Sequence, residues 1–587
     1  MSDFNAVLVT DDRIANITDK IGYAVLKGGS SIVASQYNAV SQSTSSHTFN
    51  VQCPSLETLL DRTIKWQCTV QLQIVGTPQP GKAVINYGLT DSLACYPLHQ
   101  LVSVMTATVN NNSISCNTRD ILPALVRMND NRKVARECGT TPTAVDTYYN
   151  YADGVFANNN VLGGYQNGSF DNDFVSRGSW VIDRISKTQT GAPVALDIQP
   201  AGGNNPYTAY VTFTCTENLL LSPFLWYNAG HNNGAMVGIQ NLNFVFNIGS
   251  GSRVWRSANQ MQDTNPVTVP QFATVTPVAF TGSKLLMTFL TCHSDQMLPV
   301  KCITPFAEYP RYLTSYNATL PACPPAVLGI PQQLVSTTMR TSSISLNCVP
   351  DKLIIFVRKN ASLQNCGDAD SFAVINGISL NWNNSSGILA SATQQDLYRM
   401  SCEAGSNQSW LEFQGFANSY SSVLNSVSAT PLVGTILVLD FAKAIQLSES
   451  YYSCGSLGNF VLNVVLSVAN QSSQELVNPE IVLITMNSGV FVCERGTSST
   501  YTGILTKQMV LDASEQETHS SSDLNRLVGG GSSGGGIFDS IKSLASKVAP
   551  LAKKGLEMLP ENKYAKAAAA SLGALGYGKK KVDSRLL

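Results

Sequence analysis

The stretch T-I-K-W-Q-C-T-V-Q-L-Q-I-V, residues 63–75, alternates polar and apolar side chains along its length. Successive side chains of a β-strand point to opposite faces, so a strand with this sequence gathers its apolar residues on one face. Those residues are Ile64, Trp66, Cys68, Val70, Leu72 and Ile74. We therefore predict a long strand with one face in a hydrophobic core and the other facing solvent or a neighbour.

Strand patterns continue on both sides of this stretch. Residues 48–53 alternate in the same way. Residues 101–109 and 113–116 flank Asn110-Asn111-Asn112, which predicts a hairpin. Further strands are expected at residues 209–215 and 242–248, and a short helix at residues 119–128.

The same order of patterns restarts after a proline-rich segment, residues 266–331. The alternating stretch 343–348 and the apolar run 353–357 repeat the opening of the first half. Short strands with few helices are typical of β-sandwiches, and two similar passes predict two sandwiches in tandem. The later strands of the second pass are expected at residues 372–382, 434–441, 459–468 and 480–485, with a short helix at residues 393–401.

A glycine seam, L-V-G-G-G-S-S-G-G-G at residues 527–536, separates this body from a short tail. Residues 537–587 hold ten lysines and arginines but four acidic residues, a net charge of +6, whereas the body before them carries −7. Fixing a run of glycines in one backbone conformation costs much conformational entropy. We therefore expect a flexible linker that proteases can reach. The charge asymmetry predicts an anionic partner for the tail.

The tail has apolar residues at helical spacing between Ile537 and Leu559, with Pro550 interrupting the pattern. Three interpretations stay open: a helix docked on the body or acting as a scaffold, a membrane-active helix, or a nucleic-acid contact. The residues expected to touch a membrane or nucleic acid are Phe538, Lys542, Lys547, Lys553, Lys554, Lys579, Lys580 and Lys581.

The sequence predicts no catalytic, cofactor-binding or metal site. Its five histidines are dispersed, and its fourteen cysteines form no C-x-x-C pair. Ser222 lacks a nucleophile elbow, and the adjacent Cys292 and His293 would point to opposite faces of a strand. Charged residues make up 13% of the chain, about half the usual share of ~25%, which favours a protein whose sides are covered by partners.

The sequence also lacks two kinds of targeting signal. The N-terminus lacks a signal sequence, and no apolar run reaches the ~18 residues of a membrane span. We therefore expect an intracellular product with reduced thiols.

Five stretches, in order along the chain, carry a family resemblance. They are residues 55–62, ending L-L-D-R; E-N-L-L-L-S-P-F at 217–224 with G-I-Q-N-L-N-F at 238–244; T-Q-Q-D-L-Y-R-M at 393–400; G-T-I-L-V-L-D-F-A-K-A-I-Q-L at 434–447 with G-N-F at 458–460; and residues 479–491 with Leu511-Asp512. Together they resemble the double jelly-roll major capsid proteins of the polinton, adintovirus and virophage group, which are distantly related to adenovirus hexon.

The resemblance implies an all-β chain of two tandem eight-stranded jelly rolls. Three such chains would form a pseudo-hexagonal homotrimer that tiles the icosahedral shell of a DNA virus. The implied partners are further copies of the chain, neighbouring capsomers, and penton and minor capsid proteins. The implied location is the virion capsid, assembled inside the host cell, with no enzymatic role and no cofactor.

The resemblance also implies a role for the glycine seam. Leu527-Val528-Gly529-Gly530, followed by Gly531, is similar to the cleavage sequence of adenovirus-type maturation proteases. This implies that such a protease removes the tail after Gly530. The tail's charge and amphipathic spacing, in turn, predict contact with the viral genome, an anionic scaffold or a host membrane.

These observations predict a domain plan. Its segments are an N-terminal arm (1–40), a first jelly roll (41–282), a proline-rich connector (283–334), a second jelly roll (335–512), a linker with the protease site (513–536) and the basic tail (537–587). We expect the long loops within residues 137–205 to lie at the trimer interface.

Two other classes of function remain open. Aromatic residues and Asn-x-Ser/Thr triplets would suit a secreted or surface carbohydrate-binding β-sandwich protein, but a cleavable basic tail has no role there. An enzyme on a jelly-roll scaffold needs a histidine-rich metal site, which five dispersed histidines do not supply.

Overall fold

The protein is described by a computed structural model. The described residues are 6–10, 22–26, 31–129, 140–149, 180, 182–194, 205–224, 235–262, 271–291, 301–328, 330, 332–421, 426–441, 443–445, 447 and 453–503. The glycine seam and the basic tail therefore lie outside the described residues, as do Cys292 and His293.

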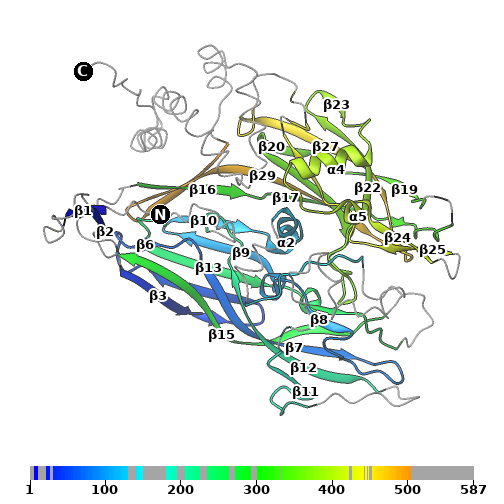
Figure 1. Ribbon diagram of the computed structural model, residues 1–587, viewed down its shortest axis with the longest axis horizontal. Coiled ribbons are helices and arrows are strands. Elements are labelled where there is room, and N and C mark those ends of the chain that lie inside the picture. The colour runs from blue at the N-terminus through cyan, green and yellow to red at the C-terminus, as the bar shows by residue number, and fades with distance from the viewer. Residues whose placement is uncertain are drawn as a thin grey trace.

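The first half of the chain forms two facing antiparallel sheets (Figure 1). One sheet has the strand order β11-β12-β7-β15-β3, and the other has the order β10-β9-β13-β5-β4. The chain crosses from one sheet to the other at each step through β3, β5, β7, β9, β12, β13 and β15, which is jelly-roll topology. The bounds are β3 (Ser31–Asn38), β4 (Ser41–Gln42), β5 (Ser46–Gln52), β7 (Lys65–Gly76), β9 (Val102–Val109), β10 (Asn112–Cys116), β11 (Arg184–Ser186), β12 (Tyr207–Asn218), β13 (Asn241–Ile248) and β15 (Thr274–Thr291).

The second half repeats this arrangement. Its sheets have the orders β16-β29-β21-β26 and β19-β27-β22-β23, and the chain again alternates between them from β20 to β29. The expected all-β fold with two tandem jelly rolls is confirmed. The bounds are β16 (Lys301–Glu308), β17 (Arg311–Ser315), β19 (Ser336–Arg340), β20 (Ile344–Cys348), β21 (Lys352–Lys359), β22 (Val374–Trp382), β23 (Ser385–Ile388), β26 (Leu437–Asp440), β27 (Leu457–Ala469), β29 (Pro479–Glu494) and β30 (Thr497–Thr502).

Smaller strands complete the fold. β8 pairs with β14, β18 with β28, β24 with β25, β1 with β2, and β6 with β15. Their bounds are β1 (Ala6–Thr10), β2 (Gly22–Leu26), β6 (Leu59–Leu60), β8 (Asp91–Leu93), β14 (Trp255–Ser257), β18 (Thr319–Leu320), β24 (Phe416–Ser421), β25 (Ser426–Pro431) and β28 (Leu476–Val477).

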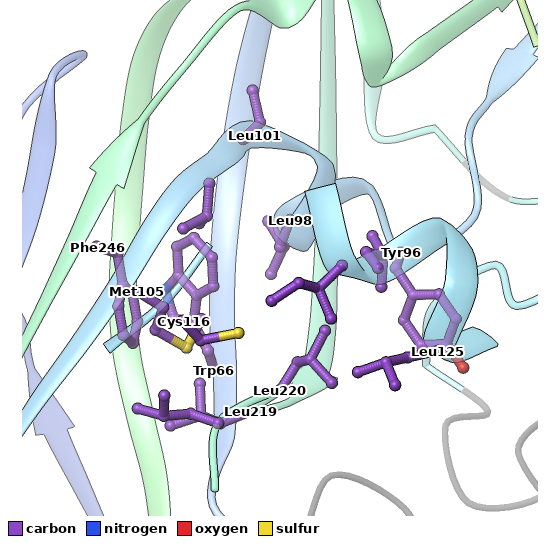
Figure 2. Packing of buried hydrophobic residues seen from close by; sticks show 14 of the residues in the cluster. Trp66, Tyr96, Leu98, Leu101, Met105, Cys116, Leu125, Leu219, Leu220 and Phe246 are labelled. Atoms are coloured by element: carbon purple, nitrogen blue, oxygen red, sulfur yellow. The ribbon is translucent and has the colours of Figure 1, made fainter. Parts of the chain in front are cut away.

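The alternating stretch 63–75 contains β7, the central strand of its sheet. β7 pairs with β12 on one side and with β15 on the other. All six apolar residues of its predicted inner face are at most 1% exposed. Trp66 packs against Phe246 of the facing sheet, with the ring centroids 4.9 Å apart (Figure 2). The predicted one-sided burial of this strand is confirmed.

The helices are short, and the two that the sequence predicts are present. α2 (Thr118–Leu125) continues as a 3₁₀ turn to Met128. α4 (Gln394–Glu403) begins after Thr393, whose hydroxyl accepts a hydrogen bond from the Asp396 backbone N–H as part of a capping box. The sequence analysis missed α1 (Pro97–Leu101) and α5 (Trp410–Gln414). No helix among the described residues is long and apolar enough to cross a lipid bilayer.

Two segments of the domain plan contain more strand than the sequence indicates. β3 lies in the segment assigned to an arm, yet it pairs with β15 over eight residues. β16 and β17 lie in the segment assigned to a connector, yet both pair with β29. Pro305 within β16 favours a connector, but β16 is an edge strand, where a missing N–H is tolerated. The exact domain boundaries stay predictions.

The buried cysteines are core residues. Cys68, Cys116 and Cys215 are at most 8% exposed. Burial raises the pKa of the Cys68 and Cys116 thiols to about 12, so neither forms a reactive thiolate at neutral pH.

Candidate functional site: the junction between the jelly rolls

One hydrophobic cluster runs through the first jelly roll and continues into the second. On the second side it includes Ile354 and Phe356 of β21, and Val482 and Ile484 of β29. The alternate residues of the same strands, such as Ile355 and Leu483, belong to the second jelly roll's own core. β21 and β29 are therefore buried on both faces, which is why their sequences are continuous apolar runs instead of alternating ones. This shared core joins the two halves.

A first ion cluster lies above this core, where α2 meets the second jelly roll (Figure 1). The Asp120 carboxylate of α2 accepts hydrogen bonds from Arg358 on β21 and from Arg311 on β17. Arg358 also donates from Nε to the Glu480 carboxylate, at 2.8 Å. Burial by itself raises the pKa of Asp120, but the two arginines hold that pKa below its ordinary value. Asp120 is therefore a buried carboxylate anion.

A second ion cluster lies beside the first, since Arg253 donates a hydrogen bond to the Arg119 carbonyl at 3.1 Å. Asp370, from the second jelly roll, pairs with Arg253 at 2.9 Å and with Arg256 at 3.2 Å, both from the first. Arg256 also donates to Asp146 at 3.1 Å, and the backbone N–H of Asp370 donates to the same carboxylate at 2.8 Å. Burial raises the pKa of Asp370, but the two arginines outweigh burial and keep it low.

Most members of both clusters are buried, since Asp120, Arg358, Glu480, Arg256 and Asp370 are at most 6% exposed, whereas the Arg311 side chain is 30% exposed. A buried ion pair is weak evidence for net stability because desolvation offsets most of the Coulomb attraction. Its geometry is nevertheless demanding, and an unpaired charge left at this depth costs several kcal/mol. The clusters therefore select one relative placement of the two jelly rolls.

Hydrogen bonds from asparagine side chains add a third connection, between β30 and the β9–β10 hairpin. Ser498 donates from its backbone N–H to the Asn111 side chain at 2.8 Å. Asn112 donates to the Thr500 hydroxyl at 3.0 Å. The asparagine run that predicts a hairpin turn thus also binds the second jelly roll.

Part of the loop region predicted at the trimer interface lies instead inside the chain. Residues 141–149 pass through the junction, where Asp146 joins the second ion cluster. The Thr147 carbonyl accepts a hydrogen bond from the Val433 N–H at 2.8 Å. Thr141, Asp146 and Thr147 are each 1% exposed. For this part the expectation of a subunit interface is wrong, because its polar groups are paired within the chain.

The motif E-N-L-L-L-S-P-F supplies a buried carboxylate of a different kind. Glu217 accepts hydrogen bonds from the backbone N–H groups of Leu98 and His99, both at 2.9 Å, and from the Thr141 hydroxyl at 3.0 Å. His99 Nε2 accepts from the Leu220 N–H at 3.1 Å, so the proton of its neutral ring sits on Nδ1, 2.5 Å from Glu217. Glu217 thus holds the start of α1. Leu98 of this helix and Leu219 and Leu220 of the motif belong to the same hydrophobic cluster (Figure 2).

The same motif reaches two other distant segments. The Pro223 carbonyl accepts a hydrogen bond from Arg62 Nε, the arginine of L-L-D-R, at 2.9 Å. The Ser222 hydroxyl accepts from the backbone N–H of Ala307, on β16 of the second jelly roll, at 2.9 Å. Ser222 therefore has a structural hydrogen bond and no partner of catalytic type among its contacts.

No group of three histidine, cysteine or acidic side chains in the described part of the chain could hold a metal ion. The predicted cleavage residues, Leu527 to Gly531, and the predicted contact residues, Phe538 to Lys581, lie outside the described residues. The sequence analysis missed the junction residues altogether. Their one signal is a charge at the end of an apolar run, as in L-I-I-F-V-R, which ends at Arg358.

Comparison with known proteins matches both halves of the chain. Residues 2–290 match the family model of the Sputnik virophage major capsid protein 1st domain. Residues 309–489 match that of the major capsid protein V20 C-terminal domain. The chain belongs to the virophage major capsid proteins. The resemblance found in the sequence is confirmed.

One curated relative supports this membership, and two solved structures share the fold. The putative capsid protein V20 of Sputnik virophage is 28% identical over 598 residues, which cover 99% of this chain and 92% of the relative. The structure of the Sputnik virophage aligns with a TM-score of 0.71 and 24% identity, covering 89% of this chain and 98% of that one. The mavirus major capsid protein aligns with a TM-score of 0.63 and 13% identity, covering 83% and 92%.

This virophage major capsid protein is thus a component of the virion capsid, which it builds with further copies of itself. The matching families are structural capsid proteins and not enzymes. The two open alternatives, a carbohydrate-binding protein and an enzyme on a jelly-roll scaffold, are therefore set aside.

Proposed function

We propose that three copies of the chain form one pseudo-hexagonal capsomer, and that such capsomers tile an icosahedral shell. The junction is the observation that carries this proposal. Two similar jelly rolls, held in one placement by a shared core and two buried ion clusters, give each chain two similar corners. Three chains related by cyclic symmetry then present six corners.

Negative-stain electron microscopy of the purified full-length protein tests this proposal. We expect compact particles with a hexagonal outline, or closed shells built from them. Single two-lobed particles at micromolar concentration and physiological salt would overturn the proposal. In the shell, the capsomers would contact neighbouring capsomers, and penton and minor capsid proteins where the symmetry changes.

The second part of the proposal is maturation. An adenovirus-like cysteine protease encoded elsewhere would cut after Gly530 and free residues 531–587. A protease cleft binds its substrate as an extended strand, and glycines at the cut allow close approach of the backbone. The position of the seam, between a folded body and a tail of opposite charge, supports this assignment.

The tail would act before and after the cut. Before it, the net charge of +6 would hold the tail to the genome or to an anionic scaffold. After it, the amphipathic stretch from Ile537 to Leu559 would disturb a host membrane during entry. Leakage of anionic vesicles by a synthetic 537–560 peptide tests the membrane step, and intact vesicles would leave only the genome or scaffold role.

A further inference from the structure

The segment between Arg311 and Arg340 is unusual because its 28 residues contain no charged side chain. Among its described residues after Leu320, four large apolar side chains are exposed, with Ile330 at 57%. We call this surface the tongue, and its exposed residues are Val327, Leu328, Ile330 and Val335. Exposed apolar residues that lie together are typical of interaction surfaces, and interface cores are depleted in charge.

The tongue is held in shape at its base. Gln332 donates from its side-chain nitrogen to the Pro324 carbonyl at 2.7 Å, which closes the loop. The backbone N–H of Cys323 donates to the Ser472 carbonyl at 2.7 Å, which anchors the loop to the second jelly roll. Pro321, Pro324 and Pro325 further restrict the backbone. A surface that is already ordered loses little entropy when it binds.

A second exposed apolar surface lies on the first jelly roll, at the end of edge strand β3. Leu290 of β15 is paired with Ile32 of β3 on one side and with Leu59 of β6 on the other. Paired residues of antiparallel strands share a face, so these three side chains form one row. Ile32 is 67% exposed. We call Ile32, Leu59 and Leu290 the edge row.

The two surfaces are far apart in one chain. Figure 1 shows β19, which follows directly from the tongue, on the right of the molecule and β3 on the far left. One chain therefore cannot bury its own tongue against its own edge row. A cyclic trimer needs a heterologous interface, in which two different patches of each chain meet across every contact.

We propose that the tongue of one chain packs against the edge row of the next copy in the capsomer. The occupant is a second copy because the protein builds its capsid with itself, and because each chain carries both halves of an apolar, charge-free contact. This inference rests on the proposed trimer and assigns the surfaces that form it.

The test introduces charges into the full-length chain and measures assembly by light scattering. Leu328→Glu alone and Ile32→Lys alone each prevent the trimer from forming. Because both side chains are exposed, each variant gives a folded monomer with an unchanged far-ultraviolet spectrum. The double variant Leu328→Glu/Ile32→Lys brings opposite charges together across each contact and regains the trimer at low salt. The matched control is Leu363→Glu, at a site 43% exposed against 45% for Leu328, and it stays trimeric.

The outcomes separate this inference from the trimer on which it rests. If the unmodified chain is monomeric, the proposed capsomer fails. If the unmodified chain and both single variants are trimeric, the capsomer stands and the assigned surfaces are wrong. If the tongue variant forms trimers but no shells, the tongue binds a partner other than the next copy in the capsomer. If the double variant stays monomeric, the tongue and the edge row do not face each other. Each of these results would overturn the pairing.

Discussion

Asp120 and Arg358 are 238 residues apart in sequence, yet their side chains pair in the buried junction between the two jelly rolls. Asp120 belongs to the first jelly roll and Arg358 to the second, and neither side chain is more than 5% exposed. The pair therefore forms only when both jelly rolls are folded and correctly placed relative to each other. In a capsid protein, that placement sets where each chain can meet its neighbours.

We predict that Asp120→Asn destabilises the protein by about 3–5 kcal/mol, because it leaves Arg358 and Arg311 facing a neutral group at this depth. Denaturant titration of the full-length chain measures the change. The matched control is Glu403→Gln, which removes an exposed partner of Arg399 and should cost less than about 1 kcal/mol. Equal effects of the two substitutions would contradict the role given to the junction.

His47 gives the protein a predicted dependence on pH. The ring is buried, and its Nδ1 shares a hydrogen bond of 2.8 Å with the Ser283 hydroxyl, which accepts another from the Trp66 indole N–H. Burial lowers the pKa of His47 from 6.5 to about 4. Between these values the unfolded chain takes up a proton that the folded chain does not, so stability falls as the pH drops from 6.5 to 4, by about 3 kcal/mol.

His47→Gln tests that dependence. The variant should be less stable at pH 7, where packing is lost, but should lose less further stability at pH 4.5 than the unmodified protein does. Denaturant titrations of both proteins at the two pH values give the difference, which separates His47 from carboxyl groups that titrate in the same range. Parallel pH profiles would rule out His47 as the source.

Gly434, the first residue of G-T-I-L-V-L-D-F, is predicted to admit no side chain. Its φ angle is +92°, and a Cβ atom would overlap the Phe372 carbonyl oxygen. Gly387 has a similar φ angle of +75° but open space around it. Gly387→Ala should therefore cost only the left-handed conformation, about 1–2 kcal/mol. Gly434→Ala should cost clearly more and reduce the yield of soluble protein, and similar yields and stabilities would contradict this account.

Mass spectrometry of purified mature particles tests the maturation proposal. We expect the capsid protein to end at Gly530, and Gly530→Val to leave the chain intact to Leu587. Ser533→Val, three residues beyond the cut, serves as the control and should be processed normally. An unmodified capsid protein that still ends at Leu587 in mature particles would end the proposal.

Alternation along the strands predicted much of the fold. Ile64 to Ile74 face the core as their spacing indicates, and the Asn110–Asn112 turn is present. Among the strands that were missed, β3 and β16 are edge strands, whose sequences are less constrained, whereas β15 lies between β7 and β3 and is interrupted by Pro277. β3 reads S-I-V-A-S-Q-Y-N, with exposed positions on both faces, and β16 contains a proline.

The junction could not be predicted in the same way. No local rule relates Asp370 to Arg253, because their pairing depends on how two complete jelly rolls are placed together. Sequence patterns report the period of a single strand, whereas these contacts join elements more than a hundred residues apart. The resemblance supplied the family, but the structure alone shows which charged residues the junction buries.

The most direct test of the account is the mass of the purified full-length protein in solution, measured by light scattering at micromolar concentration and physiological salt. The account predicts a particle of three times the chain mass of 63.0 kDa, stable to dilution. A stable particle of 63.0 kDa under these conditions would contradict the proposed capsomer.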